Sequence, residues 1–390
     1  MQHQIRISVV VIICTSYILS TVSDISKCKY EQSTFNCSGA GLQNIPDEKD
    51  LPPGLRILDL SYNNITAVPF QNFTENVSSS LTQLLLNHNQ INIIQNFSFS
   101  KLGSLETLDL SFNSLSGLDI DQNTFANMSA LQELVLDQNP LRIITRIAFT
   151  DFKLPSLRNL SLSHCELIKL ENSVIGFKTL NVLNLSWNHL NSTSLMDLPI
   201  IVMADFDTLD LSHNEITELD SFNFPLVYGL KNLILDHNPI TRLNLIYVTM
   251  YQIQTLSFRD NNIQTLDNTS LHWDLTTLRA TDFRGNPIVC DCKISWLLMD
   301  PKVKSKTVII VCDSPYVLRG RNLFDMTLMD LNCTDHHDNH TNHHDDDQNI
   351  LPIVIGVVLA GGVLLVVAVV AVVMKRKRLL RGAVVNTYLV

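Results

Sequence analysis

The sequence predicts an α/β solenoid, in which short repeated units stack side by side, followed by one transmembrane helix. Three observations predict this fold. A short apolar motif recurs over residues 55–288, two groups of cysteines flank that region, and a long apolar segment lies near the C-terminus. The net charge of -10 is modest and spread along the chain, which argues against a nucleic-acid-binding protein.

Residues 1–23 are predicted to be a secretory signal peptide. A weakly basic start at Arg6 precedes an apolar run over residues 7–19, and small residues, Thr21 and Ser23, precede the expected cleavage site. An N-terminal membrane anchor is the alternative, but this run is short for a hydrocarbon layer of about 30 Å. We therefore expect the mature chain to begin near residue 24.

The motif L-x-x-L-x-L-x-x-N-x-L recurs ten times over residues 55–288, with a period of 23 to 26 residues. Residues two apart in a strand face the same way, so Leu58 and Leu60 are expected to point inward while Asp59 faces solvent. A single repeat cannot bury these leucines, whereas a stack of repeats can. The motif therefore indicates a solenoid with one strand in each repeat.

Each motif carries a polar residue where the chain leaves its strand. An asparagine amide there is expected to satisfy buried backbone donors and acceptors, and replacing it should cost on the order of 1–3 kcal/mol. These ladder positions hold Asn63, Asn89, Asn113, Asn139, Cys165, Asn188, Asn214, Asn238, Asn261 and Asn286. A second periodic set, expected to pack on the outer side, comprises Phe73, Phe99, Phe125 and Phe149.

In these repeats the chain resembles the extracellular leucine-rich-repeat family of type I membrane proteins, with ectodomains of the Toll-like or adhesion-receptor type. The resemblance implies a curved horseshoe whose parallel strands line the concave face. It also implies cysteine caps at residues 24–54 and 289–334. The N-terminal cap departs from the family pattern because it has two cysteines where four are more usual.

The eight cysteines fall into three groups: one in the signal peptide, one free thiol and six expected in disulfides. Cys14 leaves with the signal peptide, and Cys165, at a ladder position, is expected to be a buried free thiol. The other six should be oxidised on an export route, which also disfavours a zinc site at the Cys-x-Cys pair. The resemblance implies three bridges: Cys28 with Cys37, Cys290 with Cys312, and Cys292 with Cys333.

Residues 350–374 form an apolar segment long enough to span a bilayer as a helix. The basic block that begins at Lys375 should stay cytoplasmic, which places the repeats outside the cell. The alternative is a GPI-anchor signal, but such a signal normally ends on its apolar tail. Residues 375–390 form a short cytoplasmic tail with no room for a signalling domain, and its last residues, TYLV, weakly resemble a PDZ-binding peptide.

Residues 335–349 form a stalk rich in histidine and aspartate, and we interpret it as a solvated spacer. Metal capture or pH sensing is the alternative, because imidazoles titrate near pH 6.5 and bind zinc or copper. The weak metal candidates are His336, His337, His340, His343 and His344. No cofactor is expected.

The outer part of the chain carries many N-x-S/T sequons, a density typical of a glycosylated ectodomain. The candidate sites are Asn36, Asn64, Asn72, Asn76, Asn96, Asn127, Asn159, Asn184, Asn191, Asn268, Asn332 and Asn339. Sugars at Asn159 and Asn184 would obstruct the middle of the concave face.

Aromatic and histidine residues often stand just before the ladder position. Either they form a protein-binding edge, or these flanking residues vary freely; the sequence leaves both open. Leu85 and Val135 are apolar at outward strand positions and are bracketed by aspartates that can orient a basic partner. The candidate binding residues are Asp59, Tyr62, Leu85, His88, Asp109, Phe112, Val135 and Gln138.

The predicted function is a plasma-membrane recognition or adhesion receptor that binds an extracellular protein ligand or a neighbouring receptor. No G-x-S-x-G, H-E-x-x-H or P-loop motif is present, and separate polar residues on successive repeats suit recognition better than catalysis. An enzyme is therefore not expected. The alternatives are a non-signalling co-receptor or decoy, and a structural surface glycoprotein without a specific ligand.

Overall fold

The computed structural model describes residues 25–333, except 71–72, 74, 119, 121–122, 145–153, 171–178, 198–205, 221–228, 245–252, 267–277, 301–302 and 304–306. The chain divides into two units, Met1–Thr334 and Asp335–Val390. The expected signal peptide, stalk, transmembrane segment and tail all lie outside the described residues. Within the described ranges, no helix has the length and apolar character needed to cross a membrane.

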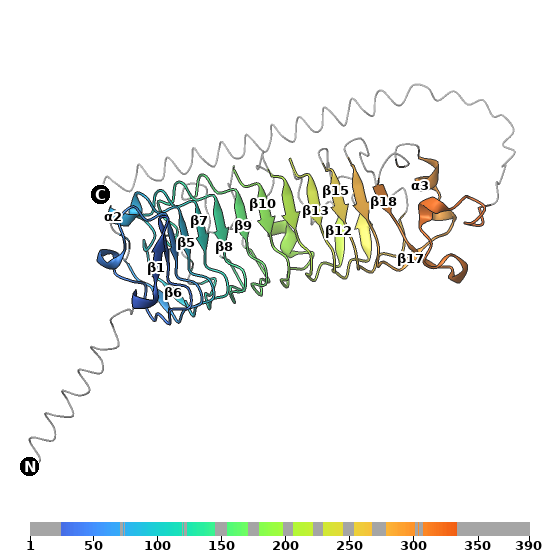
Figure 1. Cartoon of the computed structure of the whole chain (residues 1–390). Coiled ribbons are helices and arrows are strands. Elements are labelled where there is room, and N and C mark those ends of the chain that lie inside the picture. The colour runs from blue at the N-terminus through green and yellow to red at the C-terminus, as the bar shows by residue number, and fades with distance from the viewer. Residues whose placement is uncertain are drawn as a thin grey trace, which may run out of the picture. The chain divides into compact units, whose positions relative to one another are not determined.

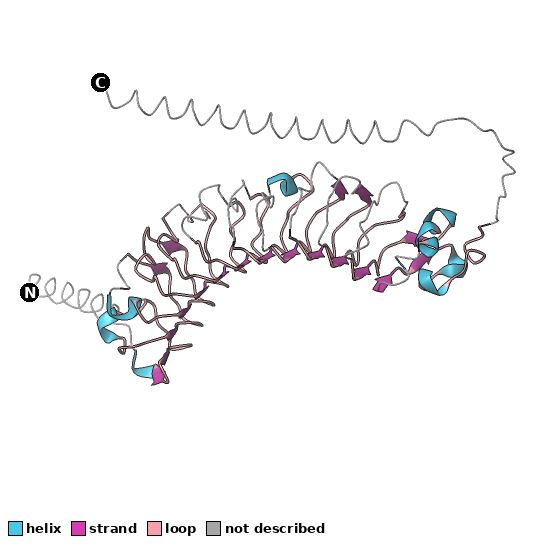
Figure 2. Cartoon of the chain, turned by 90° about the horizontal axis from the view of Figure 1, so that it is seen from above, coloured by secondary structure: helices cyan, strands magenta, loops and turns pink. Residues whose placement is uncertain are grey.

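One long sheet organises the first unit, and its strands line the inner side of a curved solenoid (Figures 1 and 2). Only the β1–β2 pair is antiparallel within this sheet; its other neighbours are parallel. In order, its strands are β1 (Lys29–Glu31), β2 (Thr34–Asn36), β3 (Ile57–Asp59), β5 (Gln83–Leu85), β7 (Thr107–Asp109), β8 (Glu133–Val135), β9 (Asn159–Ser161), β10 (Val182–Asn184), β11 (Thr208–Asp210), β13 (Asn232–Ile234), β15 (Thr255–Ser257), β16 (Ala280–Asp282) and β18 (Thr307–Ile309). We number the repeats one to ten from β3 to β16, and the caps supply the other strands.

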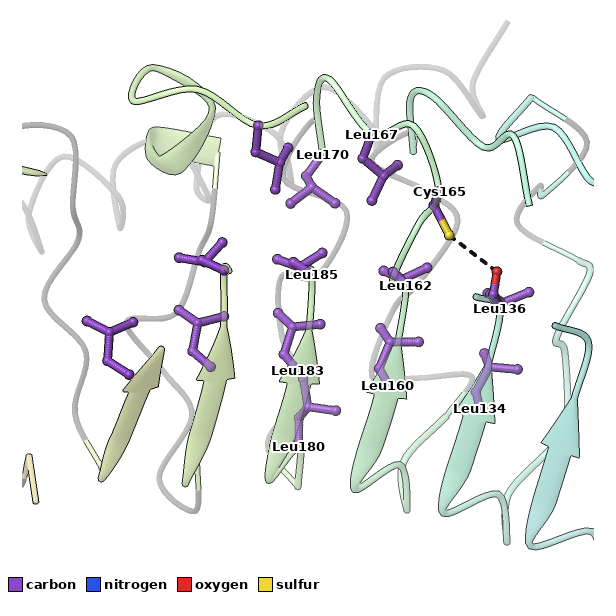
Figure 3. Close-up of a cluster of buried hydrophobic side chains, with 14 of the residues drawn as sticks. Leu134, Leu136, Leu160, Leu162, Cys165, Leu167, Leu170, Leu180, Leu183 and Leu185 are labelled. Atoms are coloured by element: carbon purple, nitrogen blue, oxygen red, sulfur yellow. Dashed lines mark hydrogen bonds between the residues drawn. The ribbon is translucent and has the colours of Figure 1, made fainter. Parts of the chain in front are cut away.

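Each repeat strand buries its central residue and leaves the two flanking residues partly open. Leu58 aligns with Leu84, and Leu84 aligns with Leu108, so identical leucines stack from strand to strand. Figure 3 shows the same arrangement further along, where Leu134, Leu160 and Leu183 lie on successive strands. The alternation expected from the motif is confirmed, because pleating sends adjacent residues to opposite faces.

The outer side carries short elements. Two small parallel pairs lie in this part of the repeats, β4 (Ala67–Val68) with β6 (Ile93–Ile94), and β12 (Glu218–Asp220) with β14 (Arg242–Asn244). The described helices are single turns: α2 (Glu75–Ser78), α3 (Trp296–Met299), η1 (Ile25–Lys27), η2 (Glu48–Asp50), η3 (Ser194–Asp197), η5 (Cys292–Ile294), η6 (Tyr316–Leu318) and η7 (Leu323–Asp325). The described residues therefore form a parallel β-solenoid, and the helical part of the α/β expectation is confined to these turns.

The ladder asparagines bond as expected. In repeat one, Asn63 Nδ2 donates to Cys37 O at 2.9 Å and Leu60 O at 3.0 Å, and Asn63 Oδ1 accepts from Gly41 N and Leu42 N at 2.9 Å. One side chain thus ties its own strand end to the preceding turn of the chain. These bonds satisfy backbone groups that the bend leaves without strand partners.

Cys165 takes the ladder position of repeat five as a buried free thiol. Its Sγ donates to Leu136 O at 3.3 Å (Figure 3), while Asn188 Oδ1 of the next repeat accepts from Cys165 N at 2.9 Å. Burial disfavours the thiolate and raises the pKa of Cys165 to about 12. The residue is therefore an inert part of the core.

Phenylalanines stack across the outer part of the first repeats. Phe73 and Phe99 have ring centroids 6.4 Å apart, Phe99 and Phe125 have centroids 6.3 Å apart, and all three rings are buried. They belong to the hydrophobic core. Phe149, the fourth member of the expected set, lies outside the described residues.

Disulfides close both ends of the solenoid. The bridges join Cys28 to Cys37, Cys290 to Cys312, and Cys292 to Cys333, the pairs that the family resemblance implied. At the C-terminal end, β17 (Ile288–Val289) pairs with β19 (Cys312–Ser314), and Trp296 Nε1 donates to Leu266 O at 2.9 Å. The β1–β2 hairpin and β18 cover strands that would otherwise expose open edges.

Candidate functional site

The residue before each ladder position adopts the left-handed backbone conformation in all ten repeats. Its φ lies between 52° and 57° in repeats one to nine and is 78° at Gly285 in repeat ten. Bulky residues avoid this region because Cβ approaches the backbone. Here bonds to the next repeat hold the turn, for example from Tyr62 N to Asn87 O at 3.0 Å and from Phe112 N to Asp137 O at 2.8 Å. Side chains at these positions are therefore presented at a fixed angle.

Rings at these positions stack into a column along the edge of the concave face. The strands of a sheet lie about 4.8 Å apart, which brings rings on successive repeats within stacking distance. Ring centroids are 4.1 Å apart for Tyr62 and His88, and 4.1 Å apart for His88 and Phe112. We call these three side chains the N-terminal stack. The next position holds Gln138, which interrupts the column.

The column resumes in repeat five. Centroid distances are 4.8 Å for His164 and Trp187, 3.6 Å for Trp187 and His213, and 4.2 Å for His213 and His237. We call these four side chains the histidine stack. His237 Nε2 then meets Asp260 Oδ2 at 3.4 Å. Within this stack each ring contacts the next.

The rings end at His237, and the last two positions of the row hold Asp260 and Gly285. A Cβ at this position would lie 2.0 Å from Asp260 Oδ1. The carboxylate of Asp260 therefore occupies the space that a side chain in repeat ten would need.

The eight candidate binding residues lie in two neighbouring rows over repeats one to four. Asp59, Leu85, Asp109 and Val135 end their strands and are neighbours in register. The other four, Tyr62, His88, Phe112 and Gln138, occupy the ring column. Tyr62 is 59% exposed and Phe112 is 46% exposed. The structure thus brings together what the sequence placed on four separate repeats.

Two details differ from the sequence interpretation. Leu85 and Val135 are half-buried on the concave face, so each keeps only part of its apolar surface open. Asp59 and Asp109 are partly engaged by their own turns, because Asp59 Oδ1 accepts from Ser61 N at 3.0 Å and Asp109 Oδ1 accepts from Ser111 N at 2.9 Å. Neither bond uses the second carboxylate oxygen of these residues.

Asp137 is a concave-face carboxylate that the sequence interpretation missed. Its Oδ1 accepts from Ser163 N of the next repeat at 2.7 Å, and burial raises the pKa of this carboxyl group. Asp236 makes the same kind of bond, accepting from Arg259 N at 2.8 Å. Both aspartates stand two residues after an apolar strand end, at Val135 and Ile234. That pairing of positions is a sequence signal for the bond.

Charges are paired differently in the two halves of the concave face. In repeats seven to ten, Lys231 Nζ meets Asp207 Oδ1 at 2.6 Å, and Asp282 Oδ2 meets Arg284 at 2.5 Å and Arg259 at 3.8 Å. In repeats one to four, the concave-face carboxylates make no ion pair with any described residue. These acids are Asp59, Glu106, Asp109, Glu133 and Asp137, and the same half carries one cation, Arg56, before its first strand. In repeats seven to ten, Asp210 and Asp236 likewise form no ion pair with a described residue.

The pKa shifts of three of these aspartates agree with the presence or absence of an ion pair. The hydrogen bond from Lys231 lowers the pKa of Asp207. Burial by itself raises the pKa of Asp282, but hydrogen bonds from Arg284 and nearby guanidinium charges lower it overall. Asp137, which has no ion pair with a lysine or arginine of the described residues, has its pKa shifted the other way by burial. The N-terminal half of the face therefore presents negative charge that the described chain does not neutralise.

The two central sequons differ in environment. Asn159 is exposed on β9, whereas Asn184 on β10 is half-buried. Asn184 Nδ2 donates to Ser161 Oγ at 3.2 Å, and its Oδ1 accepts from Ser186 N at 3.0 Å. The other sequons with described side chains are exposed: Asn36, Asn64, Asn96, Asn127, Asn191 and Asn332. Outside the described residues or side chains lie Asn72, Asn76, Asn268 and Asn339.

Nothing in the described ranges gathers three metal-ligating side chains, and the candidate histidines of the stalk lie outside those ranges. One cavity of about 750 Å³ lies in the C-terminal cap, with Leu298, Val308 and Phe324 in its wall and no titratable group in its lining. The surface that combines rings, apolar side chains and unpaired charge is therefore the concave face and its edge.

Comparison with protein families gives matches within the repeats. A profile described as Leucine rich repeat matches residues 53–115 and 116–167, and another of the same kind matches residues 178–198. CD180 antigen of Mus musculus is 27% identical over 178 residues, which is 44% of this chain and 27% of the relative. Toll-like receptor 9 of Mus musculus is 27% identical over 178 residues, which is 44% of this chain and 17% of the relative.

A third relative, chaoptin of Tribolium castaneum, is 34% identical over 118 residues, covering 30% of this chain and 15% of the relative. The matched part spans about a quarter of CD180 and less of the other two proteins. These relatives therefore share the repeated region with this chain over a fraction of their own length.

Two solved structures share the fold. A chain in the octameric complex of latrophilin 3, Unc5D and FLRT2 superposes with a TM-score of 0.64 at 20% identity, covering 78% of this chain and 98% of that chain. A chain in the Toll–Spatzle complex of Drosophila superposes with a TM-score of 0.56 at 22% identity, covering 70% of this chain and 38% of that chain. At these identities the likeness shows the fold alone.

Proposed function

We propose that this chain, a disulfide-capped leucine-rich-repeat protein of the extracellular receptor type, is a cell-surface recognition or adhesion receptor that binds a protein partner through its solenoid. Relatives that share its repeats include a Toll-like receptor. Two solved structures with its fold are protein complexes. Both points support a protein as the partner class.

The proposed binding surface is the N-terminal half of the concave face together with the N-terminal stack. The observation that carries the proposal is the meeting of half-exposed rings, half-buried Leu85 and Val135, and unpaired carboxylates over repeats one to four. Aromatic anchors dominate the energetics of many interfaces. Unpaired acids favour encounter with a positively charged partner surface. Exposed Asn159 marks the far limit of this surface if it carries a sugar.

The proposal includes a single-pass topology with the solenoid outside the cell. It rests on the sequence of residues 1–23, the apolar residues 350–374 and the basic block that follows them. Glycosylation at the exposed sequons is part of the same proposal. The C-terminal TYLV remains a weak candidate for a PDZ-type partner.

The test is an unbiased binding screen of the full-length chain displayed on cells against secreted and cell-surface proteins. For a partner found in this way, Tyr62→Ala and Phe112→Ala should each weaken binding at least roughly tenfold, because a truncated aromatic anchor loses about 1.4 kcal/mol or more. Matched changes at the other end of the column, His213→Ala and His237→Ala, should change affinity by less than roughly threefold. Surface expression of each variant is the folding control.

The proposal fails if the Tyr62 and Phe112 variants bind normally while Trp187→Ala or the two histidine changes abolish binding. It also fails if Asn184 carries no sugar and contacts the partner, because the interface would then lie on repeats five and six.

A further inference from the structure

The histidine stack differs chemically from the N-terminal stack. Three of its four rings are imidazoles, and they stand in one column over repeats five to eight with Trp187 between His164 and His213. The N-terminal stack has a single imidazole, His88, held between two rings that carry no charge at neutral pH. Histidine is the side chain whose charge changes between about pH 5 and pH 8. One edge of the solenoid therefore holds two ring stacks, one with a single imidazole and one with three.

The surroundings of His213 oppose its protonation. Burial lowers its pKa first, and the neighbouring imidazoles of His237 and His164 lower it further, while the carboxylates of Asp210 and Asp236 act in the opposite direction. The balance is a pKa below the ordinary value of 6.5. A proton on this ring is thus unfavourable while the stack is closed.

The two outer imidazoles each have a polar neighbour. His237 Nε2 lies 3.4 Å from Asp260 Oδ2. His164 Nδ1 lies 2.9 Å from Ser163 Oγ, and His164 also interacts with the carboxylate of Asp137. The centroids of the His213 and His237 rings are 4.2 Å apart, so positive charge on both rings at once would be repulsive.

We propose that the histidine stack is a pH-sensitive element of the solenoid edge. At neutral pH its rings are uncharged and stacked; on acidification its imidazoles gain protons, repel one another and open the stack between Trp187 and His237. The edge then changes from a neutral ring surface to a cationic one. The core beneath it consists mostly of leucines and includes the thiol of Cys165, whose pKa of about 12 keeps it uncharged over this range, so the core stays in place.

The direction of the stability change follows from linkage. Because the folded chain holds His213 at a lowered pKa, the unfolded chain binds more protons in the range between that pKa and 6.5. The stabilisation from the neutral ring is therefore present above pH 6.5 and is lost as the pH falls through this range. The left-handed turns beneath the stack are held by backbone hydrogen bonds to the next repeat, for example from His213 N to Asp236 O at 2.8 Å, so loss of stacking moves side chains and leaves the turns in place.

Trp187 is a built-in reporter, because a protonated imidazole in contact with an indole quenches its fluorescence. The chain has three tryptophans, so the signal of Trp187 is the difference between the full-length chain and its Trp187→Phe variant in the same detergent. We expect this signal to fall between about pH 8 and pH 5, with its midpoint below about pH 6.5. His213→Gln should reduce the pH-dependent change at least roughly twofold, since glutamine is the residue that the column already uses at Gln138.

His88→Gln is the matched control, because it removes an imidazole from the other stack and should leave the Trp187 titration unchanged. If His213→Gln lowers expression, His237→Gln makes the same test at the end of the stack. A Trp187 signal that is constant between about pH 8 and pH 5 overturns the proposal. An unchanged titration in both histidine-stack variants overturns it equally.

Discussion

Asn113 in repeat three and Asn214 in repeat seven make the same bonds, although the surfaces above them differ. Each Nδ2 donates to three carbonyl oxygens and each Oδ1 accepts one amide of a neighbouring repeat. On the concave face, repeats one to four carry unpaired carboxylates beside a stack with one imidazole. Repeats seven to ten carry ion pairs, and most rings of the second stack are imidazoles.

The comparison teaches that the interior and the surface of this solenoid are under separate constraints. Every repeat must bury its inward side chains, most of them leucines, and satisfy the same backbone groups to stack on its neighbours. The outward positions have no such requirement, so they can differ in charge and ring chemistry without changing the fold. Differences between the halves at those positions are therefore the best guide to function.

The largest expected effect tests whether the ladder asparagines stabilise both halves of the solenoid equally. Asn113→Ala and Asn214→Ala should each lower the free energy of unfolding by about 3 kcal/mol, because several buried backbone groups lose partners. Cys165→Ala should cost less, since a thiol is a weak donor. Denaturant unfolding of the purified chain measures all three. A much smaller loss in one asparagine variant than in the other would break the claim of a common framework.

A smaller effect is expected at Thr281, which replaces leucine at the buried centre of β16. Its Oγ1 is buried without a hydrogen-bond partner. Thr281→Val should raise the free energy of unfolding by about 1 kcal/mol, because it removes an unsatisfied polar atom of similar shape. Thr208→Val is the control: its Oγ1 donates to Asp207 Oδ2 at 3.0 Å, so no gain is expected there. Equal gains in both variants would contradict this explanation.

The smallest effect compares one carboxylate from each half. The raised pKa of Asp137 means that its charged form is disfavoured in the fold, so stability falls as the pH rises from 3.8 through the folded pKa. The lowered pKa of Asp282 has the opposite sign, and its stabilisation is lost as the pH falls below 3.8.

At neutral pH, Asp137→Asn should therefore stabilise the chain and Asp282→Asn should destabilise it. Each change is expected to stay under about 1 kcal/mol after solvent screening. Thermal unfolding at about pH 7 and pH 4 gives the sign for each variant. If both variants changed the stability in the same direction at neutral pH, the proposed electrostatic difference between the two halves would be contradicted.

Most of the fold could be predicted from the sequence because each of the ten repeats must bury its inward side chains and satisfy the same buried backbone groups. The inward leucines, the ladder asparagines and the buried thiol of Cys165 all follow from their places in the motif. The three bridges followed from family resemblance. The amount of helix could not be predicted, because the segments between motifs vary in length and composition.

The candidate surface was predictable only in part. The positions of Tyr62 and Phe112 were visible, but their stacking depends on a left-handed backbone and on the spacing between strands, neither of which one motif reveals. The bond from Ser163 N to Asp137 joins different repeats, so one repeat alone does not show which amide the carboxylate accepts from, although the apolar strand end at Val135 signals that such a bond forms. The engaged amide of Asn184 was hidden for the same reason.

The most direct test of the central claim is to place one new sugar on each half of the concave face. Glu133→Asn combined with Val135→Thr creates a sequon in repeat four, and Ile234→Thr creates one at Asn232 in repeat eight. An endoglycosidase shift shows that each site is occupied, and surface expression shows that each chain folds. For a partner found by the screen, the sugar in repeat four should abolish binding, whereas the sugar in repeat eight should leave affinity within roughly threefold. Normal binding with the first sugar, or loss of binding with the second alone, would contradict the account.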